Sequence, residues 1–191
     1  MNIDDLQKSA AKKINIEELL ALNSEVLYEI QGKIKSLHEA LILKTEEDYI
    51  DYFQKKNFDV LRQRESLSAN YGDIKISFSV LKRNSNFVQF GLTVIFSHRK
   101  DFFVFLGPEN KDFHIPFLAP FVNVAGVDFD QLKSIEKKLL EEHLKLRAIK
   151  DELNDLKFEY RFIESENFED ELKLKGYKNI MEVLDNIDIA K

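Results

Sequence analysis

The sequence predicts an α+β fold in which a long antiparallel coiled-coil helical hairpin carries a small antiparallel β-meander unit inserted between its arms, with short helices at the termini. Two stretches, 16–44 and 129–163, keep a seven-residue apolar repeat. Between them the apolar period changes to two, and twelve of the sixteen phenylalanines lie within 45–126. A heptad repeat is typical of paired helices, and an alternating pattern is typical of half-buried strands. The expected divisions are a short helix and first arm over 1–44, a phenylalanine-rich α+β unit over 45–127, a second arm over 128–163 and acidic helices over 164–191.

The predicted seam between the two arms contains one series of apolar residues from each stretch. Asn23 and Glu142 are the polar interruptions of the repeat. A second interpretation, two ordinary amphipathic helices packed on a globular core, stays open because Leu140 and Leu144 widen the apolar stripe beyond a narrow seam. The seam residues are Leu20, Leu27, Ile34, Leu41, Leu132, Leu139, Leu146 and Leu153.

The position of Glu142 favours an antiparallel arrangement within one chain. In a parallel homodimer of the second helix, two Glu142 carboxylates would face each other in the seam, where desolvation and repulsion both cost free energy. In an antiparallel hairpin, Glu142 lies opposite Gly32 and Lys33, and Asn23 lies near Lys150 and Asp151. Because the apolar stripe is wider than one partner helix covers, two hairpins could also pair into a homo-oligomer.

Capping residues predict where the helices begin. Asn15 followed by Glu18 resembles a capping box that separates a short helix over 3–13 from the first arm. Thr45 offers a further cap for a separate helix over 46–56. The remaining expected caps and helices are Asp128 with Gln131 before a helix over 130–158, Asn167 before a short helix, and a last helix over 178–187.

The middle of the chain reads as a meander of at least three strands. Apolar residues alternate with small or polar ones in the first two runs, and turn residues separate the runs. The expected strands are 74–80, 88–96 and 102–106, with possible edge strands at 58–62 and 113–122 and a brief strand at 158–162.

Composition and charge narrow the classes of function. The chain has no cysteine, no signal-like apolar segment at its start and no apolar run long enough to span a membrane, so we expect a cytoplasmic, soluble protein. Its net charge of −6 divides into −1 for 1–44, 0 for 45–126, +1 for 127–150 and −6 for 151–191. Because no basic stripe is present, direct binding to nucleic acid has little support.

These features favour a non-enzymatic interaction or assembly protein that uses the coiled-coil hairpin and the β unit to bind a protein partner, without a cofactor. An alternative is an acidic inhibitor, a nucleic-acid mimic of the kind found in phage or defence systems, that binds a basic nucleic-acid-binding protein. Its partner-binding residues would be Glu164, Glu166, Glu169, Asp170 and Glu171.

A second alternative is a magnesium-dependent nuclease. Asp59 followed by Asp73-Ile74-Lys75 resembles, in residue type and spacing, a pair of metal-binding carboxylates with a neighbouring lysine, and Glu47 is a further acid. Such a short pattern also arises from ordinary surface charge on a strand. No histidine, serine or glycine pattern in the sequence indicates another catalytic site.

Overall fold

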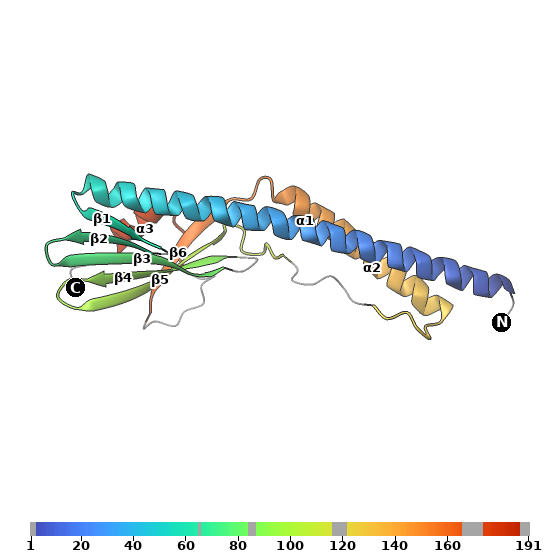
Figure 1. Cartoon of the computed structure of the whole chain (residues 1–191). Coiled ribbons are helices and arrows are strands. Elements are labelled where there is room, and N and C mark those ends of the chain that lie inside the picture. The colour runs from blue at the N-terminus through green and yellow to red at the C-terminus, as the bar shows by residue number, and fades with distance from the viewer. Residues whose placement is uncertain (1–2, 65, 84–86, 116–121, 166–173, 188–191) are drawn as a thin grey trace. The chain divides into compact units, whose positions relative to one another are not determined.

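The computed structural model describes residues 3–64, 66–83, 87–115, 122–165 and 174–187 (Figure 1). They form two compact units, here called unit 1 (Met1–Ile34 and Ile115–Asp155) and unit 2 (Lys35–His114 and Leu156–Lys191). The elements are α1 (Ile3–Lys55), β1 (Asp59–Gln63), β2 (Ser66–Tyr71), β3 (Ile74–Arg83), β4 (Val88–Ile95), β5 (Arg99–Pro108), α2 (Phe129–Glu152), β6 (Phe158–Glu164) and α3 (Ile180–Asn186). The α+β class and the antiparallel meander are confirmed.

A single helix, α1, replaces the three predicted over 3–13, 16–44 and 46–56. The two expected breaks are wrong because their capping side chains bind elsewhere. Asn15 donates to Glu136 Oε1 at 3.0 Å. The Thr45 hydroxyl lies 2.6 Å from the carbonyl oxygen of Leu41 in the preceding turn and 2.6 Å from the Tyr160 hydroxyl. With neither side chain capping a new turn, the backbone ladder of the helix continues through both positions.

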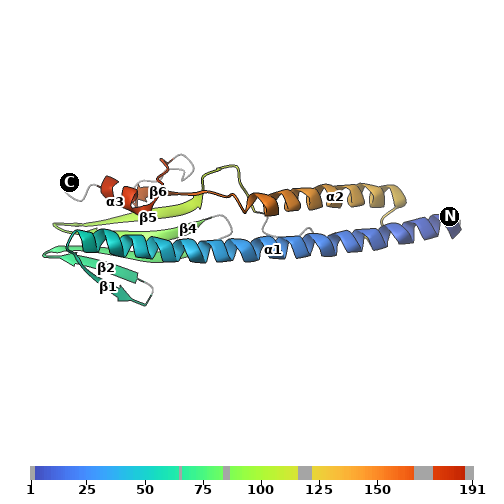
Figure 2. The same ribbon diagram turned by 90° about the horizontal axis from the view of Figure 1, so that it is seen from above.

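In unit 1, α1 and α2 lie side by side and run in the same direction (Figures 1 and 2). The side chains that bind across the pair stay between 116 and 124 residues apart in sequence along its whole length. In an antiparallel pair this separation would shrink steadily, so the predicted antiparallel hairpin is wrong. The bonded pairs are Lys12 with Glu136, Asn23 with Leu139 and His143, Glu29 with Lys150, and Lys33 with Asn154.

The parallel direction follows from the way the chain returns after the sheet. Val122, Val124 and Val127 pack against a core formed by Ile16, Leu132 and Leu139. The returning chain therefore reaches the N-terminal half of α1 before α2 begins. The prediction assumed instead that α2 starts where α1 meets the sheet.

The predicted cap of α2 and the predicted last helix over 178–187 are confirmed, but the predicted end of α2 is wrong. The Asp128 side chain accepts from the backbone N–H of Gln131, and the Gln131 side chain accepts from that of Asp128, which forms the predicted capping box. The helix ends at Glu152, however, and not near 158. The last helix, α3, is capped by Asn179, whereas the cap predicted at Asn167 lies outside the described residues.

Unit 2 contains one antiparallel sheet with the strand order β1-β2-β3-β4-β5-β6. The predicted edge strand at 58–62 is confirmed as β1, and the brief strand at 158–162 is β6, which pairs with β5. The sequence prediction missed β2, and residues 113–115 and 122, the described part of the predicted strand 113–122, are not in a strand.

The core of unit 2 lies between one face of the sheet and two helices. Ile42, Tyr49 and Phe53 of α1 pack with apolar residues of β2 to β6 and with Ile180, Val183 and Leu184 of α3. Aromatic stacking orders this core, because the Tyr49 ring lies 5.2 Å from that of Phe78, which lies 4.8 Å from that of Phe90. Since both helices pack on this face, side chains of the alternate strand positions point to the opposite face.

Candidate functional site

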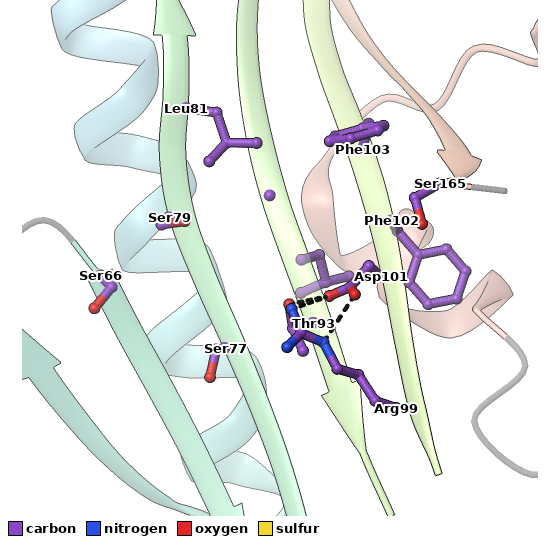
Figure 3. Close-up of a pocket in the computed structure, with 12 residues that line it drawn as sticks. Ser66, Ser77, Ser79, Leu81, Thr93, Arg99, Asp101, Phe102, Phe103 and Ser165 are labelled. Atoms are coloured by element: carbon purple, nitrogen blue, oxygen red, sulfur yellow. Dashed lines mark hydrogen bonds and ion pairs between the residues drawn. The ribbon is translucent and has the colours of Figure 1, made fainter. Parts of the chain in front are cut away.

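The opposite face of the unit 2 sheet, here called the hydroxyl face, carries small polar side chains at its centre. Strand register places Ser66 beside Ser79, which pairs with Gly91, in one row across β2, β3 and β4. The next row runs from Ser68 through Ser77 and Thr93 to Asp101 on β5. Figure 3 views this face with α1 behind the strands. Alternation in the sequences of β3 and β4 produces the arrangement, because Ile, Leu, Phe and Val occupy the core-facing positions and Ser, Gly and Thr occupy the central positions of the other face.

The centre of the hydroxyl face is hollowed. A concavity of about 420 Å³ lies over β2 to β5, because its floor consists of short side chains and its border of longer ones. Leu81 lies on this border because it follows Ser77 and Ser79 at alternate positions of β3, and the β-bulge between Val80 and Lys82 leaves it without a partner on β4. The lining residues are Ser66, Ser77, Ser79, Leu81, Gly91, Leu92, Thr93, Arg99, Asp101, Phe102, Phe103 and Ser165.

The absence of a side chain at Gly91 allows Leu81 to approach the sheet backbone closely. A Cβ atom at position 91 would lie 3.0 Å from Leu81 Cδ1, tighter than ordinary contact. Leu81 therefore lies across the sheet backbone at this point, while 53% of its surface stays exposed. The result is an apolar ridge immediately beside the concavity (Figure 3).

An ion pair forms the other border. Arg99 donates from Nε to Asp101 Oδ2 at 2.8 Å and from a terminal nitrogen to Asp101 Oδ1 at 3.1 Å, and the Thr93 hydroxyl donates to Oδ1 at 2.5 Å. The Arg99 hydrogen bonds lower the pKa of the Asp101 carboxyl below its ordinary value, and the Thr93 bond adds to this. A carboxylate bound in this way is a poor general base, because its proton affinity is low and its oxygens are already occupied.

Two serine hydroxyls on the floor are open to a ligand. The Ser77 and Ser79 side chains are half-buried, and neither hydroxyl makes a hydrogen bond within the part of the chain that the structure describes. Ser66 and Ser68 instead donate locally, to Gln63 and Asn70. The sequence carries a signal for this site in the alternation of β3 and β4, where Ser77 and Ser79 stand between apolar residues, but this alternation does not show which residues of other strands lie beside them.

The predicted nuclease residues do not gather. Asp59 pairs with Asn70, which pairs with Lys75, so one strand separates the carboxylate from the lysine. Asp73 lies in the turn between β2 and β3, and Glu47 is exposed on α1, which packs on the other face. Among the described residues, no group of three or more His, Cys, Asp or Glu side chains is arranged to hold a metal ion.

Of the predicted acidic partner-binding residues, only Glu164 is described. It is half-buried at the end of β6 and pairs with Phe102 of β5. The other four, Glu166, Glu169, Asp170 and Glu171, lie outside the described residues.

The predicted seam residues divide between the two units. Leu41 packs instead against the sheet core of unit 2, because α1 continues past the helix pair. Leu20 is half-buried beside the core of unit 1. The other six are buried: Leu27, Ile34, Leu132, Leu139, Leu146 and Leu153.

Comparison with known proteins gives no further information on function. No protein-family model matches the chain, and neither a curated protein nor a solved structure matches it. Within the described residues, no helix combines the length and apolar composition needed to cross a membrane.

Proposed function

We propose that this chain is a non-enzymatic protein-binding module that receives a protein partner on the hydroxyl face of unit 2. The observation that carries the proposal is the concavity of about 420 Å³ on the face opposite α1 and α3. A concave surface with polar groups at its centre and apolar groups around it is suited to bind another protein, since apolar area supplies affinity and hydroxyls fix orientation.

Apolar residues around the hydroxyl face support this proposal. Leu61, Leu81 and Ile95 are 47%, 53% and 39% exposed. Register places Leu61 beside Ser68, and Ile95 beside Lys75, so both point to the same side as the serines. Exposed apolar groups gathered on one face mark interaction surfaces more often than singly scattered ones do.

The chemistry of the site favours binding over catalysis. The carboxylate of Asp101 is held by Arg99 and Thr93, and no described histidine borders the concavity. The Ser77 and Ser79 hydroxyls therefore have no neighbouring base that would make either a nucleophile. They remain able to donate and accept hydrogen bonds.

The test uses a photo-crosslinking amino acid at position 79, with the same group at position 43 as the control. Leu43 is 57% exposed on α1 and lies outside the hydroxyl face. We expect one protein to be crosslinked from position 79 and not from position 43. That protein is then purified and titrated against the unmodified chain, S79R and the matched control L43R.

We expect S79R to weaken binding at least tenfold and L43R to leave it unchanged. The arginine would fill the concavity, yet its long side chain can reach solvent without disturbing the core. Equal affinity for all three proteins would contradict the proposal. Binding that weakens steeply with salt and survives S79R would point instead to the acidic residues near the C-terminus.

A further inference from the structure

From the shape and chemistry of the hydroxyl face, we infer that its partner is a second copy of the same chain, joined face to face around a twofold axis. This inference rests on the proposed protein-binding function of that face. It assigns the occupant from three observations: the pairing chemistry of the floor, the near-neutral charge of the face and the position of the Leu81 ridge.

The pairing chemistry comes from the free hydroxyls of Ser77 and Ser79. At a twofold axis, identical groups meet each other. A hydroxyl both donates and accepts, so it can bond to its own copy, whereas a carboxylate or an ammonium group cannot. The central rows of the face consist of such self-compatible groups together with Gly91.

The charge of the face also suits a second copy. The acidic side chains on its rows are Asp59, Asp101 and Glu159, and the basic ones are Lys75, Lys82, Arg99 and Arg161. These leave a charge of about +1, and Arg99 is neutralised by Asp101, while the whole chain carries −6. Two copies therefore repel each other little when they meet through this face, and a strongly charged partner gains little from it.

Shape gives the third argument. The Leu81 ridge covers Gly91 and lies directly beside the hollow over Ser77 and Ser79 (Figure 3). A twofold axis along the Ser79 row lets the two Ser79 hydroxyls meet and places Leu81 of each copy over the Ser77 end of the other copy's hollow, as facing sheets interdigitate. Five strands about 4.8 Å apart and three rows about 6.7 Å apart give roughly 500 Å² for each copy, or roughly 1,000 Å² in total. This total is in the size range of weak, transient interfaces, so self-association has to be measured up to high protein concentration.

Sedimentation equilibrium from about 1 to 200 μM tests the inference. We expect the mass to rise from 22.4 kDa toward twice that value. The variants S79R and L81D should remain monomeric across the range, whereas the control L43R should dimerise as the unmodified chain does. Thermal melts monitored by circular dichroism identify any variant that fails to fold. S79R changes the hollow and L81D changes the ridge, so the two variants test different parts of the face.

Two results would overturn the inference. One is a monomeric unmodified chain at 200 μM, and the other is a dimer that persists in both folded variants. If the unmodified chain is monomeric but S79R still abolishes binding of a purified crosslinked partner, self-association fails while the proposed function stands. If the unmodified chain is monomeric and S79R also leaves partner binding unchanged, both the inference and the proposed function fail.

Discussion

At the scale of single residues, the buried polar side chains of Asn23 and His38 affect helix register and the pH dependence of stability. Asn23 is fully buried in the helix pair of unit 1, where its amide donates to the Leu139 carbonyl oxygen at 3.1 Å. The Asn23 Oδ1 atom can only accept a hydrogen bond. The Nδ1–H of His143 therefore donates to it, at 2.9 Å. A polar residue at a seam position fixes the register of paired helices. Asn23 holds α1 and α2 in their parallel alignment.

His38 is the one buried side-chain polar group without a hydrogen-bond partner that the described residues show. It is 4% exposed, its Nε2 is unpaired, and its ring meets that of Phe158 edge-on at 6.0 Å. Burial lowers the pKa of His38 below its ordinary value of 6.5, and the charge of Arg83 lowers it further. In the folded protein the imidazole is therefore neutral near neutral pH.

This predicts loss of stability on mild acidification. The unfolded chain takes up the His38 proton as the pH falls through about 6.5, whereas the folded chain resists it to lower pH. The free energy of unfolding should therefore fall between pH 7 and pH 5. Urea titrations at several pH values should show that H38F removes this part of the slope. The control H98N, at an exposed turn residue, should keep it, and an unchanged slope in H38F would refute the assignment.

At the scale of elements, a helix begins where a potential capping side chain binds the helix backbone, and it does not begin where that side chain binds another residue. Asp128 and Asn15 have equally suitable sequence surroundings, but only Asp128 caps. The chain arrives at Asp128 from an irregular segment, so the first N–H groups of α2 need a partner. At Asn15 those groups are already bonded within α1, and the amide is free to reach Glu136.

We therefore predict that D128A lowers the free energy of unfolding by about 1 kcal/mol, the usual cost of losing a capping side chain. The control D130A removes an exposed carboxylate of the same first turn and should cost less than about 0.5 kcal/mol. Urea denaturation followed at 222 nm measures both. Equal losses would mean that the negative charge, not the capping bond, stabilises the start of α2.

At the scale of the whole molecule, α1 supplies core side chains to both compact units. Ile16 and Ile30 are fully buried in its unit 1 part, and Tyr49 and Phe53 are buried in its unit 2 part. Because the backbone hydrogen bonds of one helix form cooperatively, loosening one unit removes support from the helix that the other unit needs.

The expected consequence is a single unfolding transition. L139A creates a cavity in unit 1 and should lower the free energy of unfolding by about 2–5 kcal/mol. The near-ultraviolet signal of the tyrosines, which includes Tyr49 and Tyr160 buried in unit 2, should shift together with the helix signal. L140A, at a position 50% exposed on the same helix, should change neither by more than about 0.5 kcal/mol. Separate transitions would show that the units unfold independently.

The local pattern of the sequence determined the element types: the heptad helices, the alternating strands around the phenylalanine-rich core, and the capping box at Asp128. These depend on neighbours within a few residues, and such neighbours are visible in one dimension. The tertiary structure alone decided the direction of α2, the continuation of α1 through Asn15 and Thr45, and the gathering of Ser77, Ser79 and Thr93 beside the Leu81 ridge. A heptad repeat is compatible with parallel and antiparallel helix pairs. The sequence does not show which other residues compete for a potential capping side chain. Residues of different strands become neighbours only once the strand register is set. The candidate site belongs to this second group, since each of its residues reads as an ordinary surface position until the strands are paired.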